Sequence, residues 1–170
     1  QVISLTRSRG NRVYYLAAPV ETKPRKRGRP RRRGQKFKLQ DPSTWRQPDD
    51  TLTFPETNGK GKIRWIEVQA WQNMIMPGKQ KPDKLSMHQH PFTLVRIIAL
   101  NERHEPLYPS PVWLIVMGAE RQQLSLKEIH EAFQYRSGME QFFRFSKRNL
   151  LLDKFQTPET EHEEHWWQIV

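Results

Sequence analysis

The sequence contains no cysteine, which excludes a disulfide framework, a thiolate metal site and a cysteine nucleophile. It also lacks a long hydrophobic run. The longest one, VWLIVM at residues 112–117, is far below the roughly 20 apolar residues that cross a bilayer. We therefore expect no membrane partner and a cytoplasmic location. The first residue is Gln rather than Met, so we expect the sequence to be a piece of a longer protein.

Acidic residues are missing from one stretch, and this stretch carries most of the excess positive charge. Residues 23–38, KPRKRGRPRRRGQKFK, hold ten Lys or Arg and no Asp or Glu. The whole chain has a net charge of +11, so the remainder is nearly neutral. A run of this kind contacts many phosphates and releases their counterions, which makes binding to nucleic acid strong and dependent on salt.

Apolar periodicity predicts an α+β fold. Short strands are expected where β-branched and aromatic residues dominate, at residues 2–6, 12–17, 62–71, 92–100 and 112–118. The proline-, glycine- and charge-rich residues 19–61 are expected to be a long, mostly irregular loop. Ser125 and Glu128 form a capping box at the start of a long helix that should end near Leu152. A second helix is expected from Thr157.

One acidic residue in the long helix lies among basic and aromatic neighbours. At 100° per residue, Arg136, Glu140 and Lys147 fall on one stripe about 80° wide, together with Phe133 and Phe143. A separate apolar face, able to pack on a sheet, holds Tyr135, Met139, Phe142 and Leu150.

Two interpretations of this stripe remain open on residue chemistry alone. Arg136 and Glu140 are four residues apart, so they can form an exposed ion pair that contributes a few tenths of a kcal/mol. Alternatively, the flanking phenylalanines indicate partial burial, where an ionised glutamate needs compensation by cations or by a metal.

The spacing Phe133-x2-Arg136-x3-Glu140-x6-Lys147 resembles the Tyr-Arg-Glu-Lys signature of DDE transposases from bacterial insertion sequences. The surrounding YRSGMEQFFRFSKRNLLLDKFQTPETEHEEHWW is similar to the C-terminal helices of one such group, and the resemblance spans essentially the whole chain. Phe133 departs from the signature, which has Tyr there. A hydroxyl that could contact a phosphate or position DNA is therefore missing.

The resemblance implies a ribonuclease-H-like catalytic domain that cuts and joins DNA strands by metal-dependent phosphoryl transfer. It implies that Glu140 is the third catalytic carboxylate and a ligand of Mg²⁺ or Mn²⁺. Arg136 and Lys147 would contact phosphates of the transposon end. The implied partners are transposon-end and target DNA, and the full-length protein would be a homodimer associated with the bacterial nucleoid.

The resemblance also implies an order of segments along the chain. Residues 1–18 would be the last core strands of the catalytic domain, and residues 19–61 a basic insertion loop. Residues 62–122 would be a β-rich insertion, and residues 123–170 the two C-terminal helices that carry the third acid.

The two other catalytic carboxylates of this family should be aspartates at strand ends, and we expect them to be absent. None of the aspartates closes an apolar strand; they are Asp41, Asp49, Asp50, Asp83 and Asp153. We therefore expect that this chain alone does not cut DNA.

Within the basic stretch, Arg27-Gly28-Arg29-Pro30 resembles the core of an AT-hook, whose extended backbone lies in the narrow minor groove while its arginines enter it. The side chains expected to contact DNA are Arg27, Arg29, Arg31, Arg32 and Arg33. Two alternatives remain open: the stretch is a solvated linker, or the chain is a non-enzymatic DNA-binding protein that uses residues 23–38 with its helices as a scaffold.

Overall fold

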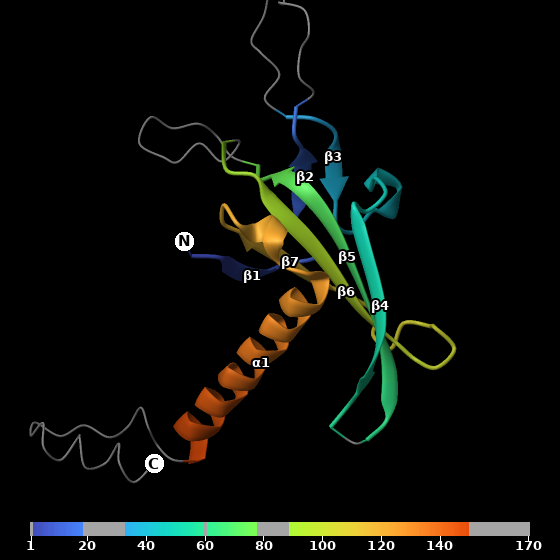
Figure 1. Cartoon of the computed structure of the whole chain (residues 1–170), viewed down its shortest axis with the longest axis vertical. Helices are drawn as coiled ribbons and strands as arrows, with labels where there is room; N and C mark the ends of the chain where they lie inside the picture. Colours follow the sequence, from blue (N-terminus) through green and yellow to red (C-terminus); the bar gives the residue numbers. More distant parts are fainter. Residues whose placement is uncertain (1, 19–32, 60, 78–88, 150–170) are drawn as a thin grey trace, which may run out of the picture. The chain divides into compact units, whose positions relative to one another are not determined.

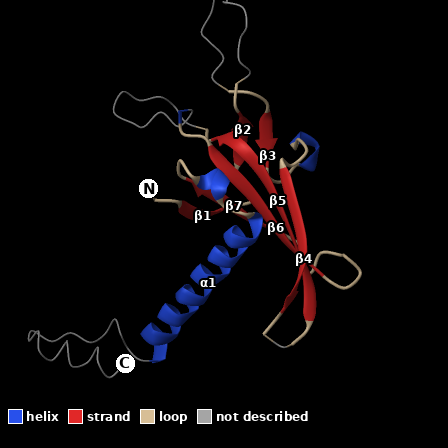
Figure 2. Cartoon of the chain, viewed as in Figure 1, coloured by secondary structure: helices blue, strands red, loops and turns tan. Residues whose placement is uncertain are grey.

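The computed structural model describes residues 2–18, 33–59, 61–77 and 89–149. These residues form a mixed α+β structure with a curled antiparallel sheet and one long helix (Figures 1 and 2), so the expectation of an α+β fold is confirmed at this level. The chain divides into two compact units, residues 1–130 and residues 131–170. The sheet and the first turn of the helix belong to the first unit.

The sheet has the strand order β1-β7-β6-β5-β2-β3, and β4 pairs with β5 outside this path. Every pairing is antiparallel. The strands are β1 (Ser4–Ser8), β2 (Val13–Leu16), β3 (Lys36–Lys38), β4 (Asp50–Thr57), β5 (Ile63–Ile75), β6 (Phe92–Leu100) and β7 (Val112–Met117).

The long strand β5 has two neighbours along one edge. Residues 63–70 pair with β4, whereas Met74 and Ile75 pair with β2. A register shift between Trp71 and Met74 separates these two parts, and Asn73 within it has a φ of 56°. Asparagine tolerates this left-handed conformation, and such irregularities bend a strand.

The connectivity requires the sheet to curl. β1 and β2 are joined by only four residues, although β7, β6 and β5 lie between them in the sheet order. The curl brings distant strands together: the rings of Phe37 on β3 and Trp113 on β7 have centroids 6.3 Å apart. The core on this face contains Tyr14, Phe37, Leu39, Trp71, Met74, Phe92, Leu94, Trp113 and Ile115.

The helix α1 (Leu126–Asn149) begins at the expected capping box. The Ser125 hydroxyl accepts a hydrogen bond from the Glu128 backbone N–H at 3.2 Å, and the Glu128 carboxylate accepts one from the Ser125 backbone N–H at 2.8 Å. These bonds satisfy donors that a helix start otherwise leaves unpaired. Leu126, Ile129 and His130 of the first turns are buried, which anchors the start of α1 in the first unit.

The expectation of an irregular loop at residues 19–61 is wrong for its described part. This part contains β3, the short 3-10 helix η1 (Pro42–Thr44) and the eight-residue strand β4. Among the residues that the structure describes, β4 pairs only with β5. Pro55 is tolerated there because a missing N–H on the other edge costs no ladder bond.

The sheet also combines strands from segments that the resemblance assigns to different parts of the protein. β1 and β2, expected to be core strands, lie in one sheet with β5, β6 and β7, expected to be an insertion. The helix expected from Thr157 lies outside the described residues. Among the residues that the structure describes, no helix is both long enough and apolar enough to span a membrane.

Candidate functional site

The helix α1 carries the three residues of the signature that hold charge. Arg136 Nε donates a hydrogen bond to Glu140 Oε1 at 3.0 Å, and Arg136 Nη2 lies 2.9 Å from the same oxygen. The side chains of Arg136 and Glu140 are 47% and 60% exposed, and Lys147 is exposed on the same helix.

The expectation that the phenylalanines partly bury Glu140 is therefore wrong. Phe143 is itself 52% exposed, and Phe133 is half-buried. The observed geometry is that of the exposed ion pair between residues four apart, which contributes about 0.3–0.5 kcal/mol. Because this stabilisation is small, either side chain can exchange its partner for another ligand at little cost.

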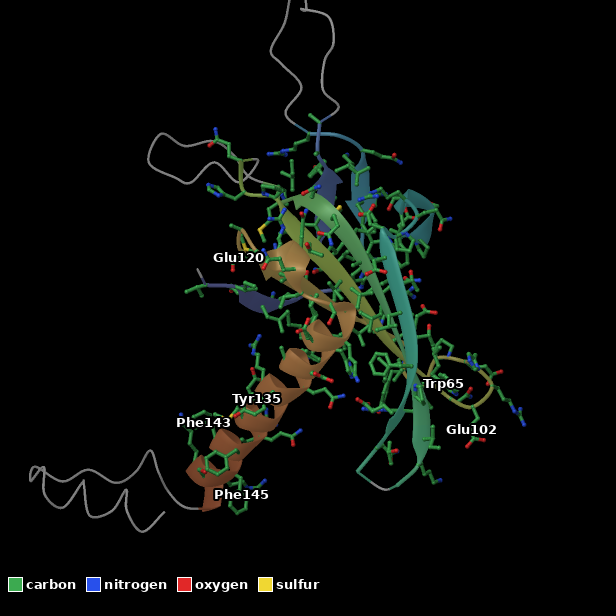
Figure 3. The ribbon with its side chains drawn as sticks, viewed as in Figure 1. Trp65, Glu102, Glu120, Tyr135, Phe143 and Phe145 are labelled. Atoms are coloured by element: carbon green, nitrogen blue, oxygen red, sulfur yellow. The ribbon has the colours of Figure 1, made fainter. Side chains whose placement is uncertain are left out.

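The face of α1 that was expected to be apolar is exposed as well. Tyr135, Met139 and Phe142 are 75%, 40% and 55% exposed, and Leu150 lies outside the described residues. Figure 3 labels Tyr135, Phe143 and Phe145, whose rings line the later turns of α1. So many exposed aromatic side chains on one helix are typical of a surface that packs against another element or partner.

A divalent cation needs several oxygen ligands, and the described residues do not gather them. In this part of the chain no three His, Cys, Asp or Glu side chains group together. Glu140 offers one carboxylate, and its neighbour Arg136 is a cation. One carboxylate beside a guanidinium does not by itself fit a magnesium site.

Two of the aspartates have structural partners in the first unit. The Asp49 carboxylate pairs with Arg46 and accepts a hydrogen bond from the Gln72 backbone N–H. The Asp41 carboxylate accepts a hydrogen bond from Ser43 Oγ at 2.6 Å. These contacts hold the segment between β3 and β4 in place. Asp83 and Asp153 lie outside the described residues.

Of the five arginines in the basic stretch that are expected to contact DNA, only Arg33 lies within the described residues; the other four are Arg27, Arg29, Arg31 and Arg32. The Arg33 guanidinium lies 5.0 Å from the centre of the Tyr15 ring. Beside it, the backbone N–H of Gly34 donates to the Leu16 carbonyl at 2.9 Å. A Cβ at position 34 would lie 2.5 Å from the Ala17 carbonyl oxygen, so this close approach of β2 to the chain entering β3 requires glycine.

A group of charged side chains that the sequence did not predict lies where α1 begins. Glu56 on β4 accepts hydrogen bonds from Arg64 Nε at 2.8 Å, and its other carboxylate oxygen lies 2.9 Å from His130 Nε2. Burial acts to raise the pKa of Glu56, but the hydrogen bonds and charges of His130 and Arg64 outweigh it and hold this pKa below its ordinary value. Arg64 and Glu56 face each other across the turn at Asn58, a pairing that a hairpin prediction would have given.

Comparison with protein-family models, with curated proteins and with solved structures finds no match for this chain.

Proposed function

We propose that this chain is part of a DDE transposase with a ribonuclease-H-like catalytic domain, and that Glu140 is its third catalytic carboxylate. The observation that carries the proposal is the placement of Arg136, Glu140 and Lys147 on one helix, all exposed, at the spacing of the family signature. Glu140 would give one oxygen ligand to Mg²⁺ or Mn²⁺, while Arg136 and Lys147 would hold phosphates of the transposon end.

The ion pair between Arg136 and Glu140 is compatible with these roles. An exposed pair of this type is worth only a few tenths of a kcal/mol, whereas a guanidinium bound to a phosphate makes stronger, charge-assisted hydrogen bonds. When DNA is present, Arg136 can turn to a phosphate and leave the carboxylate of Glu140 free to bind a cation.

The exposed apolar face of α1 also supports the proposal. Tyr135, Met139 and Phe142 are accessible to solvent in this chain, and an amphipathic helix gains stability by burying such a face. In the proposed transposase this face packs on the core sheet of the catalytic domain, to which the two catalytic aspartates also belong. Those aspartates come from outside this chain, so the isolated chain does not cut DNA.

The decisive experiment measures strand transfer by the polypeptide that contains this chain together with the two strand-end aspartates. The substrate is a duplex copied from the DNA that flanks the coding gene. Glu140→Gln should reduce the rate by about a thousandfold or more, because the amide cannot replace a charged metal ligand. The control is Glu131→Gln, an exposed glutamate on the opposite side of α1, which should leave the rate within about twofold.

An unchanged rate in Glu140→Gln would refute the catalytic role. Mg²⁺-dependent nicking of the same duplex by the isolated chain would refute the proposal that essential carboxylates come from elsewhere.

The second candidate is a DNA-binding protein without catalytic activity. It is favoured by the concentration of positive charge in residues 23–38. Tight DNA binding with no strand transfer by any polypeptide that contains the chain, in both wild type and Glu140→Gln, would favour this candidate.

A further inference from the structure

Positive charge is unevenly distributed over the sheet, even when residues 19–32 are set aside. Residues 2–18 and 33–40, which contain β1, β2 and β3, hold no Asp or Glu. Their basic residues are Arg7, Arg9, Arg12, Arg33, Lys36 and Lys38. In contrast, residues 41–59 and 61–77, which contain β4 and β5, hold five acidic and three basic residues.

Basic residues gather around β3 and the neighbouring turn between β1 and β2. Lys36 and Lys38 lie opposite Tyr15 and Val13 of β2, so they point to the same face, about 7 Å apart. At one end of β3, the Arg12 carbonyl accepts a hydrogen bond from the Leu39 backbone N–H at 3.1 Å, which places the backbone of Arg12 beside the end of this strand.

Arg9 lies in the adjoining turn between β1 and β2, where the Arg12 backbone N–H donates to the Arg9 carbonyl at 3.2 Å. At the other end of β3, Arg33 lies against the Tyr15 ring. We call Arg9, Arg12, Lys36 and Lys38 the basic platform. Residues 19–32 join β2 to β3 in the sequence, so the platform and the basic stretch 23–32 are directly connected.

Most charges of the platform are exposed and unpaired within the part of the chain that the structure describes. Arg9, Arg12 and Lys36 are exposed, and no described carboxylate forms an ion pair with them. Lys38 contacts Asp41 at 3.3 Å, yet its side chain remains 49% exposed.

The backbone that carries the platform is held by the core. Phe37, between the two lysines, is 1% exposed and packs on Trp71 and Trp113. Charges fixed in this way lose less conformational entropy on binding than charges on a disordered segment.

Protection of a sheet edge is the simpler explanation for part of this pattern. β3 is the last strand in the sheet order, and lysines on such an edge discourage pairing with other chains. However, this explanation does not account for Arg9 and Arg12, which lie in a turn and at its junction with β2. It also does not account for the absence of acidic residues from all three strands.

We propose that the basic platform binds the phosphate backbone of duplex DNA. This inference rests on the proposed function for its partner, because the charges alone select a polyphosphate. It adds a second, pre-organised set of contacts that does not involve α1 or catalysis.

The test measures binding of the full chain to a random-sequence DNA duplex by fluorescence anisotropy at several salt concentrations. The platform variant Arg12→Gln/Lys36→Gln removes two exposed positive charges. The control variant Lys62→Gln/Arg103→Gln also removes one exposed lysine and one exposed arginine, from the β4–β5 turn and the β6–β7 loop. Loss of two phosphate contacts should flatten the slope of log K against log salt by about 2 and weaken binding at ~0.1 M salt about tenfold.

The control variant should keep the wild-type slope to within about 0.5. Equal slopes in the platform and control variants would overturn the proposal, and aggregation of the platform variant with unchanged binding would assign the lysines to edge protection. Tighter binding of a duplex RNA than of the DNA duplex would overturn the choice of partner.

The DNA-binding test of the platform and the strand-transfer test of the proposed function can fail independently of each other. Binding is measured in the Glu140→Gln background as well, where catalysis is excluded. A flattened slope there, together with strand transfer that is insensitive to Glu140, would support the platform and refute the transposase. An unchanged slope together with strand transfer that depends on Glu140 would do the reverse.

Discussion

Two glutamates of this protein each pair with an arginine, in very different surroundings. Glu56 lies on β4, its side chain is 20% exposed, and both of its oxygens are engaged, by Arg64 and by His130. Glu140 lies on α1, is 60% exposed, and pairs with Arg136 one helical turn away. The contacts of Glu56 join the two strands of a hairpin and reach His130 on α1, whereas the contact of Glu140 joins neighbours on one helix.

The difference separates a carboxylate engaged by two partners from one with a single, exposed partner. Glu56 joins the hairpin of β4 and β5 to the start of α1 through its contacts with Arg64 and His130. Removing Glu56 would leave these two side chains without this anion in a half-buried place. Among the described residues, Glu140 pairs only with Arg136. Separating Glu140 from Arg136 costs little free energy. A carboxylate that is to bind a metal ion, and a guanidinium that is to bind a phosphate, both need such a weak existing contact.

The largest effect on stability is expected when Glu56, rather than Glu140, is replaced by alanine. Breaking a buried charged pair costs about 3–5 kcal/mol, and since Glu56 and Arg64 retain some exposure, we expect Glu56→Ala to lower the free energy of unfolding by about 2 kcal/mol. Glu140→Ala should lower it by less than ~0.5 kcal/mol. Urea denaturation followed by tryptophan fluorescence measures both. Similar losses in the two variants would remove the distinction between them.

The dependence of stability on pH gives a smaller effect. The pKa of Glu56 in the folded protein lies below its ordinary value of 4.5. Its ionised form therefore stabilises the fold at pH values above the unfolded pKa, and this contribution is lost as the pH falls through the folded pKa. We expect the stability difference between wild type and Glu56→Gln to be about 1 kcal/mol near neutral pH and to shrink below about pH 4.5.

Urea midpoints for both proteins between neutral pH and about pH 3 would measure this difference. A difference that stays constant across the range would mean that the charge of Glu56 contributes nothing and that only its shape matters to Arg64 and His130.

The sequence was informative where local pattern decides the structure. The strands β6 and β7 follow from runs rich in β-branched and aromatic residues, and the start of α1 follows from the Ser125–Glu128 capping box. In contrast, β4 was missed because Pro55 and the charged residues around it outweighed a turn signal, Asn58-Gly59, that is typical of hairpins. An edge strand tolerates such residues, and whether a strand is an edge depends on the whole sheet.

The candidate site shows the same limit. Helical periodicity places Arg136, Glu140 and Lys147 on one stripe, and the structure agrees that they share one helix. Their exposure depends on what covers the helix, which periodicity does not encode. Likewise, Arg12 lies beside the end of β3 only because β2 and β3 pair, so the basic platform could not be seen along the sequence.

The smallest effect concerns the coupling between Arg136 and Glu140. In a double-mutant cycle of Arg136→Ala and Glu140→Gln, we expect a coupling of about 0.3 kcal/mol, because the pair is exposed and has the base before the acid, the weaker orientation. High salt should screen it further. Unfolding in urea, followed by circular dichroism of the helix, measures each variant at low and high salt.

The matched control is the cycle of Lys147→Ala with Glu140→Gln. These residues are seven apart and share no contact among the described side chains, so their coupling should be close to zero. A coupling above about 1 kcal/mol between Arg136 and Glu140 would show that the pair is held more firmly than its exposure indicates. Glu140 would then resemble Glu56, and exchanging Arg136 for a metal ion would cost too much for the role proposed here.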